Sequence, residues 1–265
     1  MADWKFLALE RREHVLTVAF DAGGPVNALS FAVLEELETL ARDIARDSDV
    51  RAVVLTGRAH TFTGGMDLES VAALADADLS LAERRTRLKL GPAVCAAWEA
   101  VEAITIVAIE GWCVGGGLAL AASCDWRVAA EDAHLYVPEL RLGMNMSWQS
   151  VPRLTNLVGP ARAKQLLVLA EPLRAGIALD WGLVDRLAAP GRVRAEAEAL
   201  ARQVAGMPPV PVRMAKRAVD AYANALASTA SFMDADQFLL ASASEDASEG
   251  LKAFFEKRAP DFTGR

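Results

Sequence analysis

Three consecutive glycines, Gly115–Gly117, stand between an apolar segment and the helix-forming run Leu118–Ala122. Glycine lets a ligand approach bare backbone N–H groups, and the first N–H groups of a helix lack partners and lie at its positive end. Such donors could stabilise an oxygen that gains negative charge during a reaction. Close packing of the helix on a strand would explain the glycines equally well. Nucleotide-binding loops fit poorly, because Leu120 replaces the third glycine of GxGxxG and no GK[ST] follows.

A second glycine pair, Gly64–Gly65, lies in the segment Thr61–Asp67, again after an expected strand and before an expected helix. Taken alone, this pair would be an ordinary loop. An oxyanion hole needs two backbone donors that point at one oxygen. The two glycine segments therefore predict a site at which both loops meet.

Glu139 follows Val137 and Pro138 in a segment that is otherwise rich in apolar residues. A glutamate after proline is usually a solvated residue at a helix start. Here apolar neighbours on both sides would desolvate the carboxylate, which raises its pKa and suits it to proton transfer near neutral pH. Glu139 is accordingly the predicted acid–base residue.

The rest of the chain must position these residues. Alternating segments at 4–10 and 14–20 predict a β-hairpin around the charged turn Arg11–Glu13. Ser30 is expected to cap a helix to about Asp47, whose apolar residues follow a spacing of three and four. Further strands are expected at 52–56, 104–109, 126–130 and 134–136, and helices at 79–102, from Gly115, and over most of the chain after Ser147, ending with 247–258.

Composition excludes several classes of protein. The 265 residues carry 28 Lys and Arg against 35 Asp and Glu, a net charge of −7 that argues against nucleic-acid binding. Three scattered cysteines and three scattered histidines give neither a disulfide framework nor the spacing of a metal site. The most apolar stretch contains a charge and several glycines, which argues against a membrane span. We expect a cytoplasmic protein without metal or membrane contacts, formed by one α/β core and a helical C-terminal part.

Six segments in order carry a resemblance to a known family: NALS, TFTGGMDL, EGWCVGGGLALAASCDWRVAA, VPELRLG, ALDWGLVDRL and FFEKRAPDF. Together they resemble the crotonase family, also called the enoyl-CoA hydratase/isomerase family, over essentially the whole chain. The resemblance implies an α/β fold, a spiral of ββα units with a C-terminal helical trimerisation region. It implies a core over residues 1–200 and a region over 201–265 that completes the coenzyme A site and the oligomer interface.

The resemblance also implies roles for individual residues on an acyl-CoA thioester substrate. The backbone N–H groups of Met66 and Gly116 would hold the thioester oxygen, and Glu139 would move the proton. Lys257 and Phe262 match positions that reach the coenzyme A of a neighbouring subunit in a trimer or a dimer of trimers. No cofactor is expected beyond the coenzyme A of the substrate. The remaining substrate-binding residues expected are Val26, Ala28, Gly64, Gly65, Asp67, Leu68, Gly115, Pro138, Leu142 and Trp148, the last as a wall of the acyl pocket.

One departure from the family pattern bears on the reaction. Hydratases of the family use a second glutamate where this chain has Ala119, and dienoyl-CoA isomerases use an aspartate where it has Ser147. A lone glutamate matches the enoyl-CoA isomerases, so a shift of a double bond through an enolate is the main prediction. The alternative is a single-glutamate hydratase, or a hydratase-lyase that would need Tyr136 or Tyr222. A third hypothesis is a degenerate relative that binds acyl-CoA without turnover.

Overall fold

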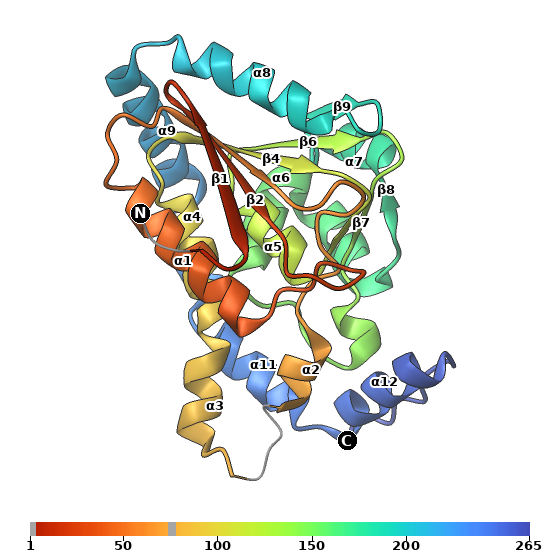
Figure 1. Ribbon diagram of the computed structural model, residues 1–265. Helices are drawn as coiled ribbons and strands as arrows, with labels where there is room; N and C mark the ends of the chain where they lie inside the picture. Colours follow the sequence, from red (N-terminus) through yellow and green to blue (C-terminus); the bar gives the residue numbers. More distant parts are fainter. Residues whose placement is uncertain (1–3, 74–77) are drawn as a thin grey trace.

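The computed structural model describes residues 4–73 and 78–265. A six-stranded sheet runs through it in the order β1-β2-β3-β4-β6-β9, and Figure 1 shows its strands side by side. β1 pairs with β2 in an antiparallel hairpin, and every later neighbour pair is parallel. The strands are β1 (Leu7–Arg12), β2 (Val15–Phe20), β3 (Ala52–Thr56), β4 (Ile104–Ile109), β6 (Trp126–Ala130) and β9 (Arg186–Ala188).

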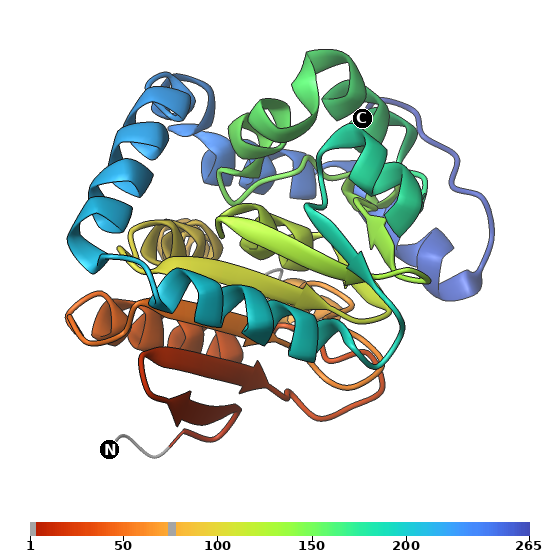
Figure 2. The ribbon, with the colours of Figure 1, turned by 90° about the horizontal axis from the view of Figure 1, so that it is seen from above.

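The interior strands are apolar because both faces of the sheet are covered. All residues of β3 and β4 are buried, as expected for parallel strands between helical layers. The amphipathic helix α8 (Val193–Ala205) covers one face through an apolar stripe that includes Val193, Ala197 and Leu200. Figure 2 shows α8 lying across the front of the sheet.

The opposite side is formed by α1 (Phe31–Ile44), α4 (Leu90–Glu99) and α5 (Gly116–Ala122), which pack in sequence against one another. The side chain of Ser30 caps α1 as predicted, accepting the N–H of Val33 at 3.4 Å. A small second sheet joins β5 (Trp112–Val114), β7 (His134–Tyr136) and β8 (Leu173–Arg174). This sheet leads the chain into the triple glycine and toward Glu139.

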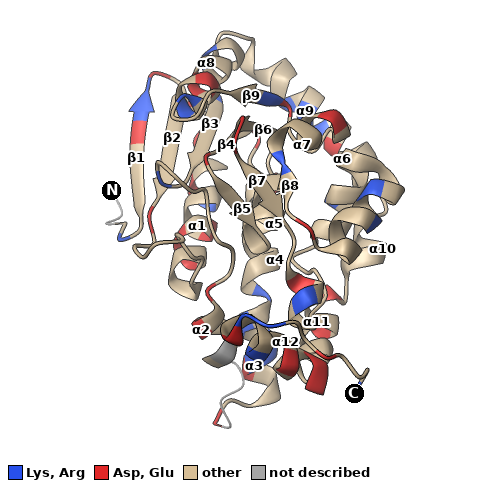
Figure 3. Cartoon of the chain, turned by 90° about the vertical axis from the view of Figure 1, so that its right-hand side faces the viewer, with Lys and Arg blue, Asp and Glu red and all other residues tan. Residues whose placement is uncertain are grey.

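Helices complete the rest of the chain, and four of them gather at the end of the molecule opposite α8 in Figure 1. That end holds α2 (Leu68–Ala72), α3 (Leu81–Leu88), α11 (Asp234–Ser242) and α12 (Glu245–Glu256), and the ribbon there carries many positions coloured as charged in Figure 3. Arg85 of α3 pairs with Asp236 of α11 at 2.5 Å. The remaining elements are the 3₁₀ turn η2 (Glu139–Leu142), α6 (Ser150–Lys164), the π turn η3 (Gln165–Leu169), α7 (Ala175–Trp181), α9 (Pro209–Ala223) and α10 (Ala227–Ser231).

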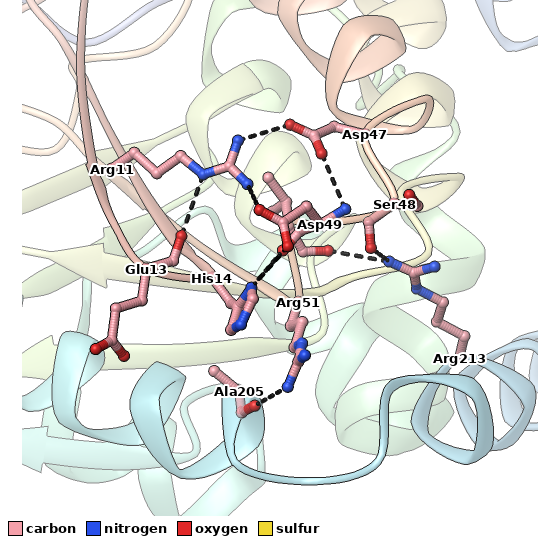
Figure 4. A network of polar contacts seen from close by, with 10 residues as sticks. Arg11, Glu13, His14, Asp47, Ser48, Asp49, Arg51, Ala205 and Arg213 are labelled. Atoms are coloured by element: carbon pink, nitrogen blue, oxygen red, sulfur yellow. Dashed lines mark hydrogen bonds and ion pairs between the residues drawn. The ribbon is translucent and has the colours of Figure 1, made fainter.

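A polar network holds the hairpin and α9 to the loop between α1 and β3 (Figure 4). Arg11 pairs with Asp47 at 2.8 Å and also with Asp49. Arg213 of α9 donates to the carbonyl of Ser48 at 2.8 Å. The loop is thus held both by the hairpin and by α9.

The structure corrects two predicted elements. The hairpin turn lies at Glu13 and His14, not at Arg11–Glu13, because Arg11 and Arg12 still pair with residues of β2 while Glu13 takes the left-handed φ of 51°. The helix expected over 79–102 is two helices that meet at Lys89. Pro92 has no N–H to donate to the carbonyl of Leu88, so the helical ladder is interrupted there. The expected boundary at residue 200 falls inside α8.

Candidate active site

Two glycine loops lie side by side because the segment before Gly64 is hydrogen-bonded along β5. Thr63 N donates to Trp112 O at 2.9 Å, and Val114 N donates to Thr63 O at 3.1 Å. A side chain at Gly117 would collide with this arrangement, since its Cβ would lie 2.1 Å from Cγ2 of Thr63. The close packing that glycine allows is therefore present, and it brings the two loops together.

Two backbone N–H groups at this junction are free. Neither Met66 N nor Gly116 N donates a hydrogen bond within the described part of the chain. Their surroundings are ordered, because Leu29 N donates to Gly65 O at 2.8 Å and Asp67 N to Leu29 O at 3.0 Å. Gly116 is the first residue of α5 and lies at the positive end of that helix. Both residues line one cavity, which is the arrangement that an oxyanion hole requires.

Glu139 begins η2 and directs its carboxyl group at the triple glycine. A Cβ on Gly115 would lie 2.6 Å from Oε1 of Glu139, so only glycine fits there, and its φ of 50° also favours glycine. The Oε2 atom is buried and has no hydrogen-bond partner among the residues that the structure describes. Burial raises the pKa of Glu139 from 4.5 to about 7. A carboxyl group that titrates near neutrality can both take up and release a proton.

The cavity holds about 170 Å³ of water-accessible space and is mainly apolar. Among the described residues that line it, Glu139 is the one acid and Arg87 the one base. The structure brings ten of the predicted site residues to its wall: Gly64, Gly65, Met66, Leu68, Gly115, Gly116, Pro138, Glu139, Leu142 and Trp148. It does not place Val26, Ala28, Asp67, Lys257 or Phe262 there.

Two of these other residues, Val26 and Asp67, hold the backbone at Gly64 and at the start of α2. The carbonyl of Val26 accepts the N–H of Gly64 at 2.6 Å, and a Cβ on Gly64 would lie 2.9 Å from Cβ of Val26. The carboxylate of Asp67 caps α2 by accepting the N–H of Ser70 at 3.1 Å. Ala28 lies between them in the chain, next to the buried Leu29. Lys257 ends α12 with a φ of 54°, and Phe262 lies partly exposed beyond it.

Asn27 is a positioning residue that the sequence reasoning missed. It is fully buried with a φ of 51°, and its side chain donates to Phe62 O at 2.8 Å and accepts the N–H of Ala22 at 2.8 Å. Its carbonyl accepts the hydroxyl of Thr63 at 2.6 Å. Asparagine tolerates the left-handed region better than most residues. Its position shortly after Gly23-Gly24-Pro25 was the sequence feature that could have indicated this conformation.

The positions that depart from the family pattern provide no second carboxylate. Ala119 is fully buried within α5, and Ser147 lines the cavity as a neutral hydroxyl. Tyr136 also lines the cavity, whereas Tyr222 is exposed on α9. Cavity residues from α11 and α12, Phe238 and Phe254, had not been predicted, because sequence spacing does not reveal contacts over such separations.

Other reactive residues serve the structure. The Asp125 carboxylate accepts hydrogen bonds from Thr105 N at 2.7 Å and from Lys216 Nζ at 2.7 Å, so its role is structural. Burial raises the pKa of Cys95 and of Cys124 to about 12, so both are unreactive thiols. Within residues 4–73 and 78–265 no group of acids, histidines and cysteines could hold a metal ion. No helix in these ranges is long and apolar enough to cross a membrane.

Comparison with known proteins identifies this arrangement. The family description "Enoyl-CoA hydratase/isomerase" matches residues 10–265. The chain belongs to the enoyl-CoA hydratase/isomerase family. It is 32% identical to a crotonyl-CoA hydratase of Syntrophomonas wolfei over 260 residues, 98% of each chain. It is also 32% identical to a short-chain-enoyl-CoA hydratase of Clostridium acetobutylicum over 251 residues, 94% of each chain.

Solved structures of the family show the same fold. The crystal structure of an enoyl-CoA hydratase/isomerase from Pseudoalteromonas atlantica superposes with a TM-score of 0.86 at 28% identity, covering 98% of this chain and 100% of that one. The crotonase-type α/β fold predicted from the sequence is therefore confirmed. As a member of this family, the chain is an enzyme of acyl-CoA thioesters.

Proposed function

We propose that the chain is an enoyl-CoA hydratase in which a single carboxylate, that of Glu139, carries out the acid–base chemistry. The observation that carries this proposal is the buried Glu139 carboxyl group, which faces the triple glycine and has a pKa of about 7. Relatives over nearly the whole chain bear hydratase names. These names support hydration above the isomerisation that the lone glutamate first indicated.

The proposed mechanism uses the free N–H groups of Met66 and Gly116 to hold the thioester oxygen. As water adds to C3 of the substrate, the carboxylate of Glu139 takes its proton, and the electron pair of the double bond moves toward the oxygen held by the two N–H groups. The protonated Glu139 then gives this proton to C2, so that one water is consumed and the enzyme is restored. The two donors stabilise the enolate between these steps.

The same proposal covers the coenzyme A part of the substrate and the assembly of the enzyme. Coenzyme A would lie along Val26–Ala28 and along Gly64–Leu68, a loop that also contributes to the cavity wall. Lys257 and Phe262 of a neighbouring copy would contact it in a trimer or a dimer of trimers, in the cytoplasm and without another cofactor. Support for assembly comes from a group of exposed apolar side chains on α9 and the turn after it, since such patches mark surfaces that contact another protein. They are Val210, Met214, Val219, Tyr222 and Leu226.

Isomerisation of a 3-enoyl-CoA is the second candidate, and Ala119 is the observation that favours it. With no carboxylate at this position, one group must activate water and also protonate C2. A double-bond shift needs only one group, which removes a proton at C2 and returns it at C4. Glu139 would suffice for that reaction.

The test offers crotonyl-CoA and a 3-enoyl-CoA separately to the purified protein. Hydration removes the absorbance of the conjugated thioester from the first and adds the mass of one water. Isomerisation makes that absorbance appear from the second at constant mass. We expect hydration to have the higher kcat/KM. A higher kcat/KM for the double-bond shift would make the isomerase the correct assignment, and the absence of both reactions would reject enoyl-CoA chemistry.

A further inference from the structure

The indole of Trp148 lies in a slot between two helices, formed by a glycine on each. A Cβ on Gly91 of α4 would lie 2.2 Å from both Cε2 and Nε1 of the indole. A Cβ on Gly116 of α5 would lie 2.7 Å from its Cη2 and 2.9 Å from its Cζ3. The five-membered ring therefore packs on α4 and the six-membered ring on the residue that offers the free N–H. All three residues line the active-site cavity.

The backbone around Trp148 is held in an unusual conformation. Trp148 and Gln149 have φ values of 61° and 55°, which residues with a side chain rarely adopt in succession. Two hydrogen bonds hold the backbone in this conformation. Gln149 N donates to Asp234 Oδ2 at 2.5 Å, and Arg153 Nη1 donates to Trp148 O at 3.2 Å. Arg153 is itself fixed by two hydrogen bonds to Glu99 of α4, at 3.0 and 2.8 Å. The indole is thus a fixed part of the cavity wall.

We infer that Trp148 closes the acyl end of the cavity and restricts the enzyme to short acyl chains. The inference rests on the proposed function, because it takes the Gly116 N–H as the thioester anchor. A thioester held at Gly116 has the indole edge directly beside it, and the chain extending from the thioester meets the ring before it can reach α4. Gly91 is required for this arrangement, because the absence of a side chain there allows the indole to pack against α4.

Two substitutions move the wall in opposite directions. Trp148→Ala removes the ring and opens the slot toward Gly91, so longer acyl chains gain room and apolar contact. Gly91→Ala places a methyl group within the volume of the indole, and the ring must shift away from α4 into the cavity. The first change should favour long chains, and the second should weaken the binding of every acyl chain.

The experiment measures kcat/KM for crotonyl-, hexenoyl-, octenoyl- and decenoyl-CoA. One methylene in an apolar pocket changes discrimination by roughly 10–200-fold, so Trp148→Ala should raise the decenoyl-to-crotonyl ratio at least about tenfold. Gly91→Ala should lower kcat/KM for crotonyl-CoA about tenfold or more, and Gly91→Ala with Trp148→Ala should regain the profile of Trp148→Ala. Trp181→Ala, which removes an indole that does not line the cavity, should keep the wild-type profile.

Binding of saturated acyl-CoAs of the same lengths, measured by calorimetry, separates this inference from the proposed reaction. If the wild type catalyses neither reaction but Trp148→Ala still gains affinity for long chains, the wall is confirmed and the reaction assignment fails. An unchanged length profile in folded Trp148→Ala overturns the inference. So does a Gly91→Ala loss that the double variant does not recover.

Discussion

Loss of hydration at the Glu139 carboxyl group both costs free energy and suits the group to proton transfer near neutral pH. The carboxyl group loses hydration inside an apolar cavity, and no group in the described part of the chain compensates by a hydrogen bond to its buried Oε2. Burial therefore raises the pKa of Glu139 to about 7, and the neutral acid is favoured below that pH. A substrate that places a water or an acidic C–H beside Oε2 would supply the missing partner.

Replacing Glu139 by Gln tests this role directly. The amide has nearly the same shape but cannot accept a proton, so kcat should fall about 10²–10⁴-fold, the usual contribution of a positioned acid–base group. Calorimetry should show acyl-CoA affinity close to that of the wild type. The exposed Glu131→Gln is the matched control. Turnover by Glu139→Gln at the control rate would remove Glu139 from the mechanism.

The pKa of Glu139 also predicts two pH dependences. Hydration begins with the carboxylate, so kcat/KM should rise with pH through about 7. Stability should change in the opposite direction. Between 4.5 and about 7 the folded protein binds more protons at this site than the unfolded chain, so this contribution to the free energy of unfolding is lost as pH rises through that window. Thermal melting across the window should show the wild type losing stability relative to Glu139→Gln as pH rises, and parallel curves would contradict the raised pKa.

The sequence correctly predicted the desolvated environment of Glu139, because apolar neighbours along the chain also surround its carboxyl group in space. It could not identify Asn27, whose role depends on carbonyl groups of two other loops, nor the slot for Trp148, which joins Gly91 and Gly116 across two helices. The choice of reaction is a further limit. Ala119 indicated an isomerase, a prediction that stays unconfirmed, and the relatives' names favour the hydratase alternative.

Among the elements, η2 and α12 form the contact on which the catalytic turn depends. Gly250 of α12 lies against η2 so closely that a Cβ would come within 2.5 Å of the carbonyl carbon of Leu142. Leu142, Met144 and Ala247 form a small apolar cluster of their own. The helix therefore fixes the turn that begins with Glu139.

We expect Gly250→Ala to separate α12 from η2 and to lower kcat/KM, with a smaller effect on the melting of the main core. Gly176→Ala is the matched control, because Gly176 also lies in a helix but has no atom within 4 Å of its added Cβ. This change should leave activity unaltered and stabilise the protein by up to about 1 kcal/mol. Equal activity of the two variants would show that α12 does not position the turn.

The strands and helices with clear periodicity were predicted because their patterns follow from burial on one or both faces. β3, β4 and the apolar face of α1 are examples. The short strands β5, β8 and β9 were missed, although β7 was predicted at the same length, since two or three residues seldom show a clear alternation. Their pairing depends on partners that are distant in the sequence.

Across the whole molecule, a buried ion pair joins α9 to the central sheet. Lys216 Nζ lies 2.7 Å from Asp125 Oδ2 and also donates to Ala103 O at 3.2 Å, with 3% of its side chain exposed. Asp125 in turn holds Thr105 of β4. The helical C-terminal region is thus attached to the sheet by charge as well as by apolar packing.

Lys216→Met should reduce the free energy of unfolding by about 3–5 kcal/mol, because it leaves the Asp125 carboxylate partly buried without its counter-charge. Urea denaturation measures this loss. Lys164→Met, at an exposed position, should change stability by no more than about 0.5 kcal/mol. A similar small effect for both variants would mean that Asp125 is satisfied without Lys216.

The position of Phe238 and Phe254 in the cavity wall has a consequence for how the enzyme is made. A ribosome adds residues from the N-terminus, so both glycine loops and Glu139 emerge well before α11 and α12. A nascent chain halted before α11 would hold the reactive groups but leave their cavity open to water, and Gln149 would lack the Asp234 carboxylate. The cavity around these groups is therefore completed only when the C-terminal helices α11 and α12 have been added.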